Sequence, residues 1–330
     1  MITNQPDVKK SNEIGGEFEK VVTCLVCGDK QQVFLFNGRD DRYGYPESFP
    51  VVKCWNCGLV YLGARPHVTR VGDLYERYYS MVNFEDQKDK QSDNLKVRLK
   101  KSPLFTIFRS IKVTREDLYR NISIRPGVRI LDIGSGISTE NAHNVLLQGG
   151  DWVAVEVDER KCRILEKSGL KSFWGTLETY CETSPAPFDY IVLSQVLEHI
   201  YQPRQFLTSC KSLLLPGGRI VLSCPNYDSF LREKHGQHWL HWHIPYHVAQ
   251  YNHCTLTLLA ESMGLQISRF ETFTPITWFF TQRQLAHGIA YHDSLLDKDR
   301  LRWFQRLLDI YLASQHRINQ GDAFVAQLEV

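Results

Sequence analysis

The chain has 330 residues, of which 43% are hydrophobic and 23% are charged, and its formal net charge is +2 at pH 7. This length suits one large domain with a smaller one, and the composition is that of a soluble globular protein. The small charge argues against a nucleic-acid or anionic-membrane partner, and no apolar run reaches transmembrane length. The first twenty residues are polar and lack an apolar core, which predicts a cytoplasmic chain without a secretory signal.

Two cysteine pairs organise the segment that follows a polar tail at residues 1–19. Cys24-Leu-Val-Cys27-Gly and Cys54-Trp-Asn-Cys57-Gly are two C-x2-C-G units with 26 residues between them. A glycine after the second thiolate suits a tight turn that aims both sulfurs at one ion, and four thiolates leave no open coordination position. We therefore predict a structural zinc module at residues 20–65. Two unrelated reduced pairs and a redox dithiol are the alternatives, and the other five cysteines are interpreted as small apolar residues.

Residues 66–125 are predicted to form a helical linker or lid. Tyrosines gather in its first part, at Tyr75, Tyr78 and Tyr79, and an apolar group follows between residues 104 and 111. The charged stretch between them, residues 85–101, is predicted to be a solvated helix or linker, because its acidic residues dilute a phosphate-binding patch.

From Arg129 the chain alternates strand-length apolar runs with amphipathic stretches, which is typical of β-α-β units and a parallel sheet. Seven strands are expected, at Val128–Ile133, Trp152–Val157, Lys171–Phe173, Tyr190–Ser194, Arg219–Ser223, Leu265–Phe270 and Ala323–Val330. Helices are expected at Thr139–Leu147, Glu159–Lys167, Thr176–Cys181, Arg204–Leu214 and Leu256–Ser262. The predicted class is α/β, with a Rossmann-like sheet over residues 126–330 and a helical insertion at about 276–318.

A glycine turn follows the first of these strands. Gly134 and Gly136 allow close approach of a ligand to the backbone, and the helix that follows offers unpaired amides. Glu156 ends the next strand, where a carboxylate can take both hydroxyls of a ribose. A nicotinamide site would continue as G-x-G-x-x-G, but position 139 is Thr.

Three motifs resemble those of class I S-adenosylmethionine methyltransferases. Their order and spacing match that family over residues 126–330. They are Leu131-Asp132-Ile133-Gly134-Ser135-Gly136, then Phe188–Leu193 followed by Gln195-Val196-Leu197-Glu198-His199, and Leu213-Leu214-Leu215-Pro216-Gly217-Gly218.

The resemblance implies a set of cofactor-binding residues. The turn Gly134-Ser135-Gly136 would pass under the methionyl part, Asp132 would orient the amino-acid end, and Glu156 would bind the ribose. Val157 would flank the adenine. Thr176 and Leu177 stand where many relatives place an aspartate near the adenine amine, and Gln195 and Val196 would line the methionine side.

Six of the twelve histidines fall in a segment after the fifth strand, residues 235–253: His235, His238, His241, His243, His247 and His253. This segment overhangs the carboxyl edge of the sheet, where such folds bind ligands. Three interpretations compete: hydrogen-bonded structural rings, a catalytic base, and a second metal site.

The pattern Pro245-Tyr246-His247 resembles the segment of sugar C-methyltransferases in which a Tyr/His-Glu-His cluster handles the proton. This resemblance implies His247 as the base, with Tyr246 standing where the family has Glu and His199 as the second candidate. We expect no counterpart of the large C-terminal domain of that family after the methyltransferase sheet. The chain is therefore predicted to methylate a small molecule, a nucleotide-activated or glycan-linked sugar, on oxygen or carbon. An RNA methyltransferase and a pseudoenzyme that docks a partner are the alternatives, and the sequence leaves the oligomeric state open.

Overall fold

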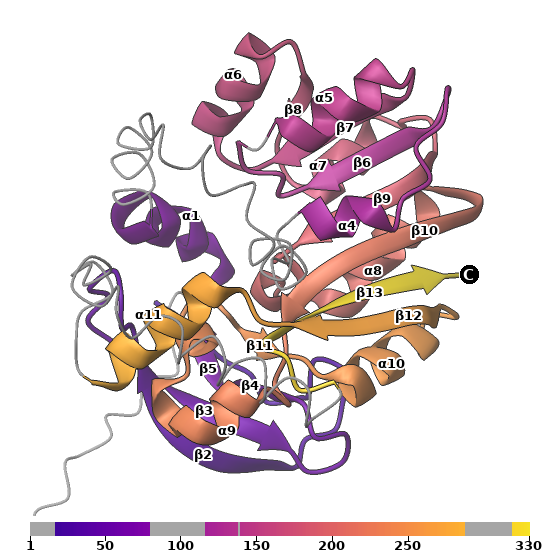
Figure 1. The fold of residues 1–330 in the computed structure, drawn as a ribbon. Coiled ribbons are helices and arrows are strands. Elements are labelled where there is room, and N and C mark those ends of the chain that lie inside the picture. The colour runs from indigo at the N-terminus through magenta and orange to yellow at the C-terminus, as the bar shows by residue number, and fades with distance from the viewer. Residues whose placement is uncertain (1–16, 80–115, 138, 288–318) are drawn as a thin grey trace, which may run out of the picture.

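The computed structural model describes residues 17–79, 116–137, 139–287 and 319–330, and its largest element is a seven-stranded sheet (Figure 1). The strands follow the order β12-β13-β10-β9-β6-β7-β8. Five neighbours, from β8 to β10, run parallel, and β13 is antiparallel to both β10 and β12. The predicted Rossmann-like fold class is confirmed.

The strand positions agree with the sequence prediction to within a few residues at most ends. Their bounds are β6 (Arg129–Ile133), β7 (Asp151–Glu156), β8 (Lys171–Trp174), β9 (Phe188–Ser194), β10 (Leu214–Pro225), β12 (Gln266–Phe273) and β13 (Ala323–Glu329). β10 is longer than expected because its first residues pair with the start of β9 before a bulge around Pro216-Gly217-Gly218.

Successive strand residues point to opposite faces, and each face is covered by helices. Ile130, Ala154 and Val221 pack on one side with α4 (Glu116–Arg120), α5 (Glu140–Leu147) and α6 (Glu159–Lys167). Leu131, Val155 and Ile220 pack on the other with α7 (Leu177–Glu182), α8 (Pro203–Ser212) and α10 (His253–Glu261). The result is a helix-sheet-helix sandwich whose central strands are buried on both sides.

A second sheet joins the N-terminal cysteine segment to the larger domain. Its order is β11-β4-β3-β2, where β2 is Gln32–Arg39, β3 is Ser48–Cys54, β4 is Val60–Leu62 and β11 is Ala249–Gln250. The short strand β11 belongs to the histidine-rich segment and pairs with β4 (Figure 1). The zinc-binding candidate Cys54 and its neighbour Tyr61 also share one buried core with Leu197 and Leu256 of the larger domain. The two parts are thus packed as one body.

The remaining elements are short. A two-stranded sheet pairs β1 (Phe18–Lys20) with β5 (Ala64–Pro66). Short helical turns follow, at η1 (Val68–Arg70), α1 (Val71–Leu74), η2 (Tyr75–Tyr79), η3 (Leu197–His199), η4 (Gly236–His238) and η5 (Leu240–Trp242), together with the helices α9 (Phe230–His235) and α11 (Ile276–Ala286).

Parts of two predicted helical regions, residues 80–115 and 288–318, lie outside the described residues, as do residues 1–16 of the predicted tail. Within the part of the chain that is described, no helix combines the length and the apolar character that crossing a bilayer requires.

Candidate active site

The glycine turn after β6 has the backbone conformation that glycine favours. Gly134 and Gly136 both have φ +64°. A Cβ at position 134 would stand 2.8 Å from Cγ2 of Val196, the residue that follows β9 by two. A side chain at position 134 would therefore push the turn away from the end of β9. The glycine turn and Val196, which the resemblance assigned to the same cofactor, therefore lie against each other.

Glu156 ties this turn to the end of β7. Its side chain is buried, with the residue 3% exposed. Oε2 accepts a hydrogen bond from the backbone amide of Gly136 at 3.1 Å, and Oε1 accepts one from Val157 at 3.0 Å. The amide of Asp158 also donates to Oε1, at 3.3 Å, and Nζ of Lys161 lies 3.8 Å from it. An ionised carboxylate has about four acceptor positions, so Oε2 keeps room for a further donor such as a ribose hydroxyl.

Asp132 is held in a network that the sequence analysis missed. Its Oδ2 accepts a hydrogen bond from the Tyr119 hydroxyl at 2.7 Å, and that hydroxyl accepts one from Nε1 of Trp152 at 2.8 Å. Tyr119 comes from α4, thirteen residues before Asp132. Nothing local in the sequence links the three side chains, because they come from a helix and two different strands. The network fixes the orientation of Asp132 below the glycine turn.

The other predicted cofactor residues occupy different environments. Gln195, with φ +55°, donates from Nε2 to Oγ of Ser223 at 3.2 Å. Val157, the residue after β7, is 65% exposed, so its apolar side chain is accessible to a ligand. Thr176 caps α7 by accepting from the backbone of Thr179. Leu177 is buried in the core, and Ser135 is fully buried within the turn.

A cluster of rings lies beyond the end of β9. Nδ1 of His199 stands 2.8 Å from the Tyr75 hydroxyl and 3.0 Å from the backbone oxygen of Tyr246. The His199 and His247 rings pack edge to face, with centroids 4.7 Å apart. The Tyr75 ring packs edge to face against the Tyr246 ring at 5.5 Å. The structure thus brings together all three predicted catalytic residues and adds Tyr75 from the link.

The tautomers of two of these histidines follow from their partners. Nδ1 of His247 lies 2.8 Å from the backbone oxygen of His241. A carbonyl oxygen only accepts, so Nδ1 carries the proton in both His247 and His199, and Nε2 carries the lone pair. Nε2 of His247 then accepts from Nδ1 of His243 at 3.2 Å.

Burial sets the protonation of this cluster. It lowers the pKa of His199 to about 4 and the pKa values of His243 and His247 well below the usual range. Burial also raises the pKa of Glu198 to about 8. At neutral pH the three imidazoles are therefore neutral, and the Nε2 lone pair of His247 faces Nδ1 of His243.

Other histidines of the segment have structural partners. Nε2 of His241 lies 3.0 Å from Oδ2 of Asp322, a fully buried residue at the start of the C-terminal strand. The same carboxylate accepts hydrogen bonds from Ser229 at 2.6 Å and from Trp239 at 2.7 Å. His253 begins α10 and packs on Phe270 at 4.6 Å between centroids. For these residues the interpretation as bonded or packed rings fits the geometry.

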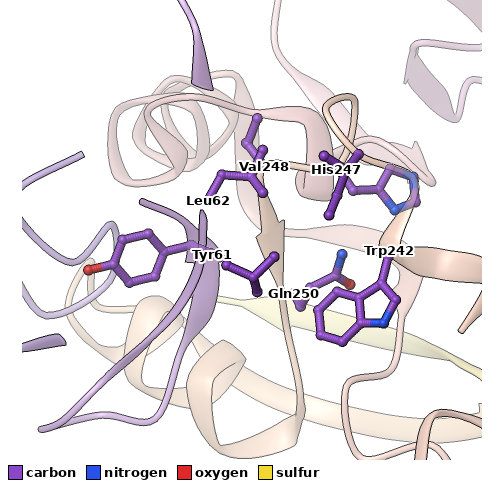
Figure 2. A pocket seen from close by; sticks show the side chains of 8 residues that line it. Tyr61, Leu62, Trp242, His247, Val248 and Gln250 are labelled. Carbon is purple, nitrogen blue, oxygen red and sulfur yellow. The ribbon is translucent and has the colours of Figure 1, made fainter. Parts of the chain in front are cut away.

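His247 lies against the N-terminal sheet (Figure 2). A gap too narrow for a water molecule runs between Tyr61 and Leu62 of β4 and the side chains of Trp242, His247, Val248 and Gln250. The backbone amide of Leu62 donates to the backbone oxygen of Val248 at 3.0 Å, and the amide of Val248 donates to the backbone oxygen of Glu198 at 2.8 Å. The position of His247 is therefore set by the cysteine segment on one side and by the end of β9 on the other.

The four predicted zinc ligands converge. Their sulfurs lie within 4.8 Å of one another, with Cys24 and Cys57 3.4 Å apart and Cys27 and Cys54 3.5 Å apart. Zinc-sulfur bonds of about 2.3 Å in a tetrahedron place the sulfurs about 3.8 Å apart, so the set fits zinc. Gly28 and Gly58 have φ +75° and +78° and donate to the backbone oxygens of Cys24 and Cys54. Each pair thus forms the glycine-ended turn expected from its spacing.

Comparison with known proteins defines the class. A family model described as a methyltransferase domain matches residues 101–269, about half of the chain. The chain belongs to this family, and it carries a class I S-adenosylmethionine-dependent methyltransferase domain. The prediction of an S-adenosylmethionine-dependent methyltransferase is confirmed at this level.

Individual relatives are more distant. A ubiquinone biosynthesis O-methyltransferase of Xylella fastidiosa is 30% identical over 106 residues, covering 30% of this chain and 43% of that protein. One from Cereibacter sphaeroides is 31% identical over 126 residues, covering 36% and 51%. The chain therefore spans about half the length of these curated relatives. An S-adenosylmethionine-dependent methyltransferase structure from Archaeoglobus fulgidus has a TM-score of 0.45 at 19% identity, covering 69% of this chain and all of that one. A likeness at this level supports no conclusion about function.

Proposed function

We propose that this protein transfers a methyl group from S-adenosylmethionine to a small-molecule acceptor bound at the His199, Tyr246 and His247 cluster. The observation that carries the proposal is the contact of Gly134 with Val196, three residues before His199. It joins the cofactor turn to the start of the ring cluster. Methyl transfer needs the acceptor atom in line with the methyl group, and such positioning supplies much of the rate.

For the cofactor, we assign the ribose hydroxyls to Glu156 and the amino-acid end to Asp132 through the turn Gly134-Ser135-Gly136. Val157 and the backbone at Thr176 and Leu177 would contact the adenine, and Gln195 and Val196 the methionine side. When bound, the cofactor supplies a methyl group on a sulfonium cation. The buried carboxylates nearby offset that positive charge.

For the acceptor, we assign activation of the reacting group to His247, with His199 second and Tyr246 lining the site. In the simplest form, Nε2 of His247 accepts the acceptor's proton. Tyr75, at 2.8 Å from His199, would position that ring. The two relatives described above are named O-methyltransferases, which favours transfer to oxygen over transfer to carbon.

We further propose a sugar, nucleotide-activated or glycan-linked, as the acceptor, on the likeness of the Pro245-Tyr246-His247 segment to sugar C-methyltransferases. Cys24, Cys27, Cys54 and Cys57 would hold a structural zinc in the segment 20–65, with 66–125 as the link and 126–330 as the methyltransferase domain. None of the nine cysteines, all of which lie in the described residues, forms a disulfide, which suits the cytoplasm, where thiols stay reduced.

The test is an intact-mass assay of the full-length protein with S-adenosylmethionine and separate pools of nucleotide sugars, free glycans, quinols and RNA. A one-methyl gain on a sugar that is lost in His247→Ala supports the proposal in full. A gain confined to quinols keeps the site and replaces the sugar. Methylation of RNA alone, or cofactor binding without product in any pool, contradicts the proposal.

A further inference from the structure

We propose that Glu198, His199 and His247 form a second metal site, which takes a divalent transition metal such as Mn²⁺ or Fe²⁺ and holds the acceptor's hydroxyl. This inference rests on the proposed function and specifies how that function is carried out. The two imidazoles would act on the acceptor through the metal and not by direct proton transfer.

The three residues converge from two separate segments. Glu198 and His199 form the end of η3 just beyond β9, and His247 stands two residues before β11. One ligand atom from each lies within 4.8 Å of the other two. Metal–ligand bonds of about 2.0–2.2 Å place neighbouring ligand atoms about 2.8–3.6 Å apart in octahedral or tetrahedral geometry, so the three side chains would draw together by up to about 1–2 Å when the ion enters.

The imidazoles are oriented as metal ligands are. Each donates Nδ1–H to a backbone carbonyl, His199 to Tyr246 at 3.0 Å and His247 to His241 at 2.8 Å. This second hydrogen bond fixes the tautomer and the ring plane and leaves Nε2 to bind the ion. The contact between Nδ1 of His243 and Nε2 of His247 would break when the ion enters.

The carboxylate supplies an independent observation. Glu198 is 0% exposed, and among the described residues its Oε1 has no hydrogen-bond partner. Its Oε2 accepts only a weak bond from the Cys224 thiol at 3.3 Å. A buried carboxyl group either keeps its proton or pairs with a cation, and a divalent ion between Glu198 and the two histidines would displace that proton and bind the unpartnered oxygen.

The donor set indicates the class of metal. Two imidazoles and one carboxylate suit Mn²⁺, Fe²⁺, Co²⁺ or Zn²⁺ and leave coordination positions open, whereas the four thiolates of the cysteine site select zinc and close it. The protein would thus hold two metals of different kinds.

The open coordination positions of the ion would bind the acceptor's hydroxyl. A hydroxyl bound to the ion loses its proton to solvent more readily, because the cation stabilises the alkoxide. The alkoxide oxygen then forms a bond to the methyl carbon. The carbon–sulfur bond breaks, and its electron pair stays on sulfur as the neutral thioether. No oxidant or reductant is needed.

Mn²⁺ provides the test, since it avoids thiolates and its free form is measured by electron paramagnetic resonance. Titration of the full-length protein loaded with one zinc per chain, so that only the four cysteines are occupied, should show one bound Mn²⁺ per chain. Glu198→Gln and His247→Ala should each weaken that binding by roughly 10–100-fold or more. His238→Ala, which alters an exposed histidine of the same segment, should bind like wild type. Glu198→Gln keeps the volume of the side chain and guards against a folding artefact.

The outcomes separate this inference from the proposed function. Mn²⁺ binding that the two variants lose supports the metal site, even if no acceptor pool gains a methyl group, in which case only the proposed function fails. Absence of stoichiometric Mn²⁺ binding, or equal binding by all variants, overturns the metal site. In that case the proposed function survives if His247→Ala still abolishes methyl transfer.

Discussion

The cysteine site and the histidine cluster are both sets of ligand-type side chains, but they are assembled differently. The cysteines come as two local units, in which spacing and glycine alone set the geometry. The histidine cluster takes Tyr75 from the link, His199 from the end of β9 and His247 from the segment before β11. A site made from local turns is readable from sequence, whereas a site made where several segments converge needs the fold.

The largest effect is expected at the cysteine site. Cys54→Ser should release zinc and lower the melting temperature strongly, because structural zinc contributes about 10–16 kcal/mol to the folding of small zinc domains. The metal content and thermal unfolding of the variant measure this effect. Cys254→Ser, at an exposed cysteine, is the control and should retain both zinc and stability. Full stability of Cys54→Ser would mean that the two pairs are unrelated thiols.

The histidine cluster should respond in rate and not in stability. His247→Ala should slow methyl transfer by about 10²–10⁴ while the affinity for S-adenosylmethionine stays within about twofold, because the ring acts on the acceptor. Single-turnover kinetics and calorimetric titration separate the two quantities. If cofactor affinity fell in parallel with the rate, His247 would belong to the cofactor site and the comparison between the two regions would need revision.

The contact of His241 with Asp322 should instead affect the stability of the fold. Asp322→Asn replaces the buried carboxylate that bonds His241, Ser229 and Trp239 and should destabilise the fold by about 1–3 kcal/mol at neutral pH. The hydrogen bonds and His241 hold the pKa of Asp322 below its usual value, so its stabilisation is present above the unfolded-state pKa of about 3.9. That stabilisation is lost as pH falls through the lower folded-state pKa. Urea unfolding of both proteins from pH 7 to pH 3 should show the difference in stability shrinking at the acid end, and a constant difference would argue against a lowered pKa of Asp322.

The smallest of these effects is expected at the cofactor turn. Glu156→Ala should weaken cofactor binding by roughly 1.5–3 kcal/mol, the value of hydrogen bonds to a charged group. Glu156→Gln, which keeps the shape and some hydrogen bonds, should lose less cofactor-binding free energy than Glu156→Ala. Calorimetric titration with S-adenosylhomocysteine measures both. Unchanged affinity in Glu156→Ala would leave the carboxylate a structural role, through its bonds to Gly136, Val157 and Asp158, and remove the ribose assignment.

Most of the sheet could be predicted from the sequence because its strands are continuous apolar runs of the right length. The glycine turn and Glu156 could be placed because they are defined by strand ends. β11 could not be predicted, since two residues, Ala249 and Gln250, carry no periodic signal. The bond of Tyr119 to Asp132 and that of Tyr75 to His199 were also out of reach, because each joins residues whose contact depends on how helices pack.

The pairing of β11 with β4 also bears on how such a protein can arise and change. His247 is held two residues from β11, whose one strand partner among the described residues, β4, belongs to the cysteine segment. A recombination event that exchanged this segment for an unrelated one would leave the ring without its anchor, although every residue of the methyltransferase sheet was inherited intact. We therefore expect the two parts to be inherited together, with substitutions in β4 accompanied by compensating changes around residues 248–250.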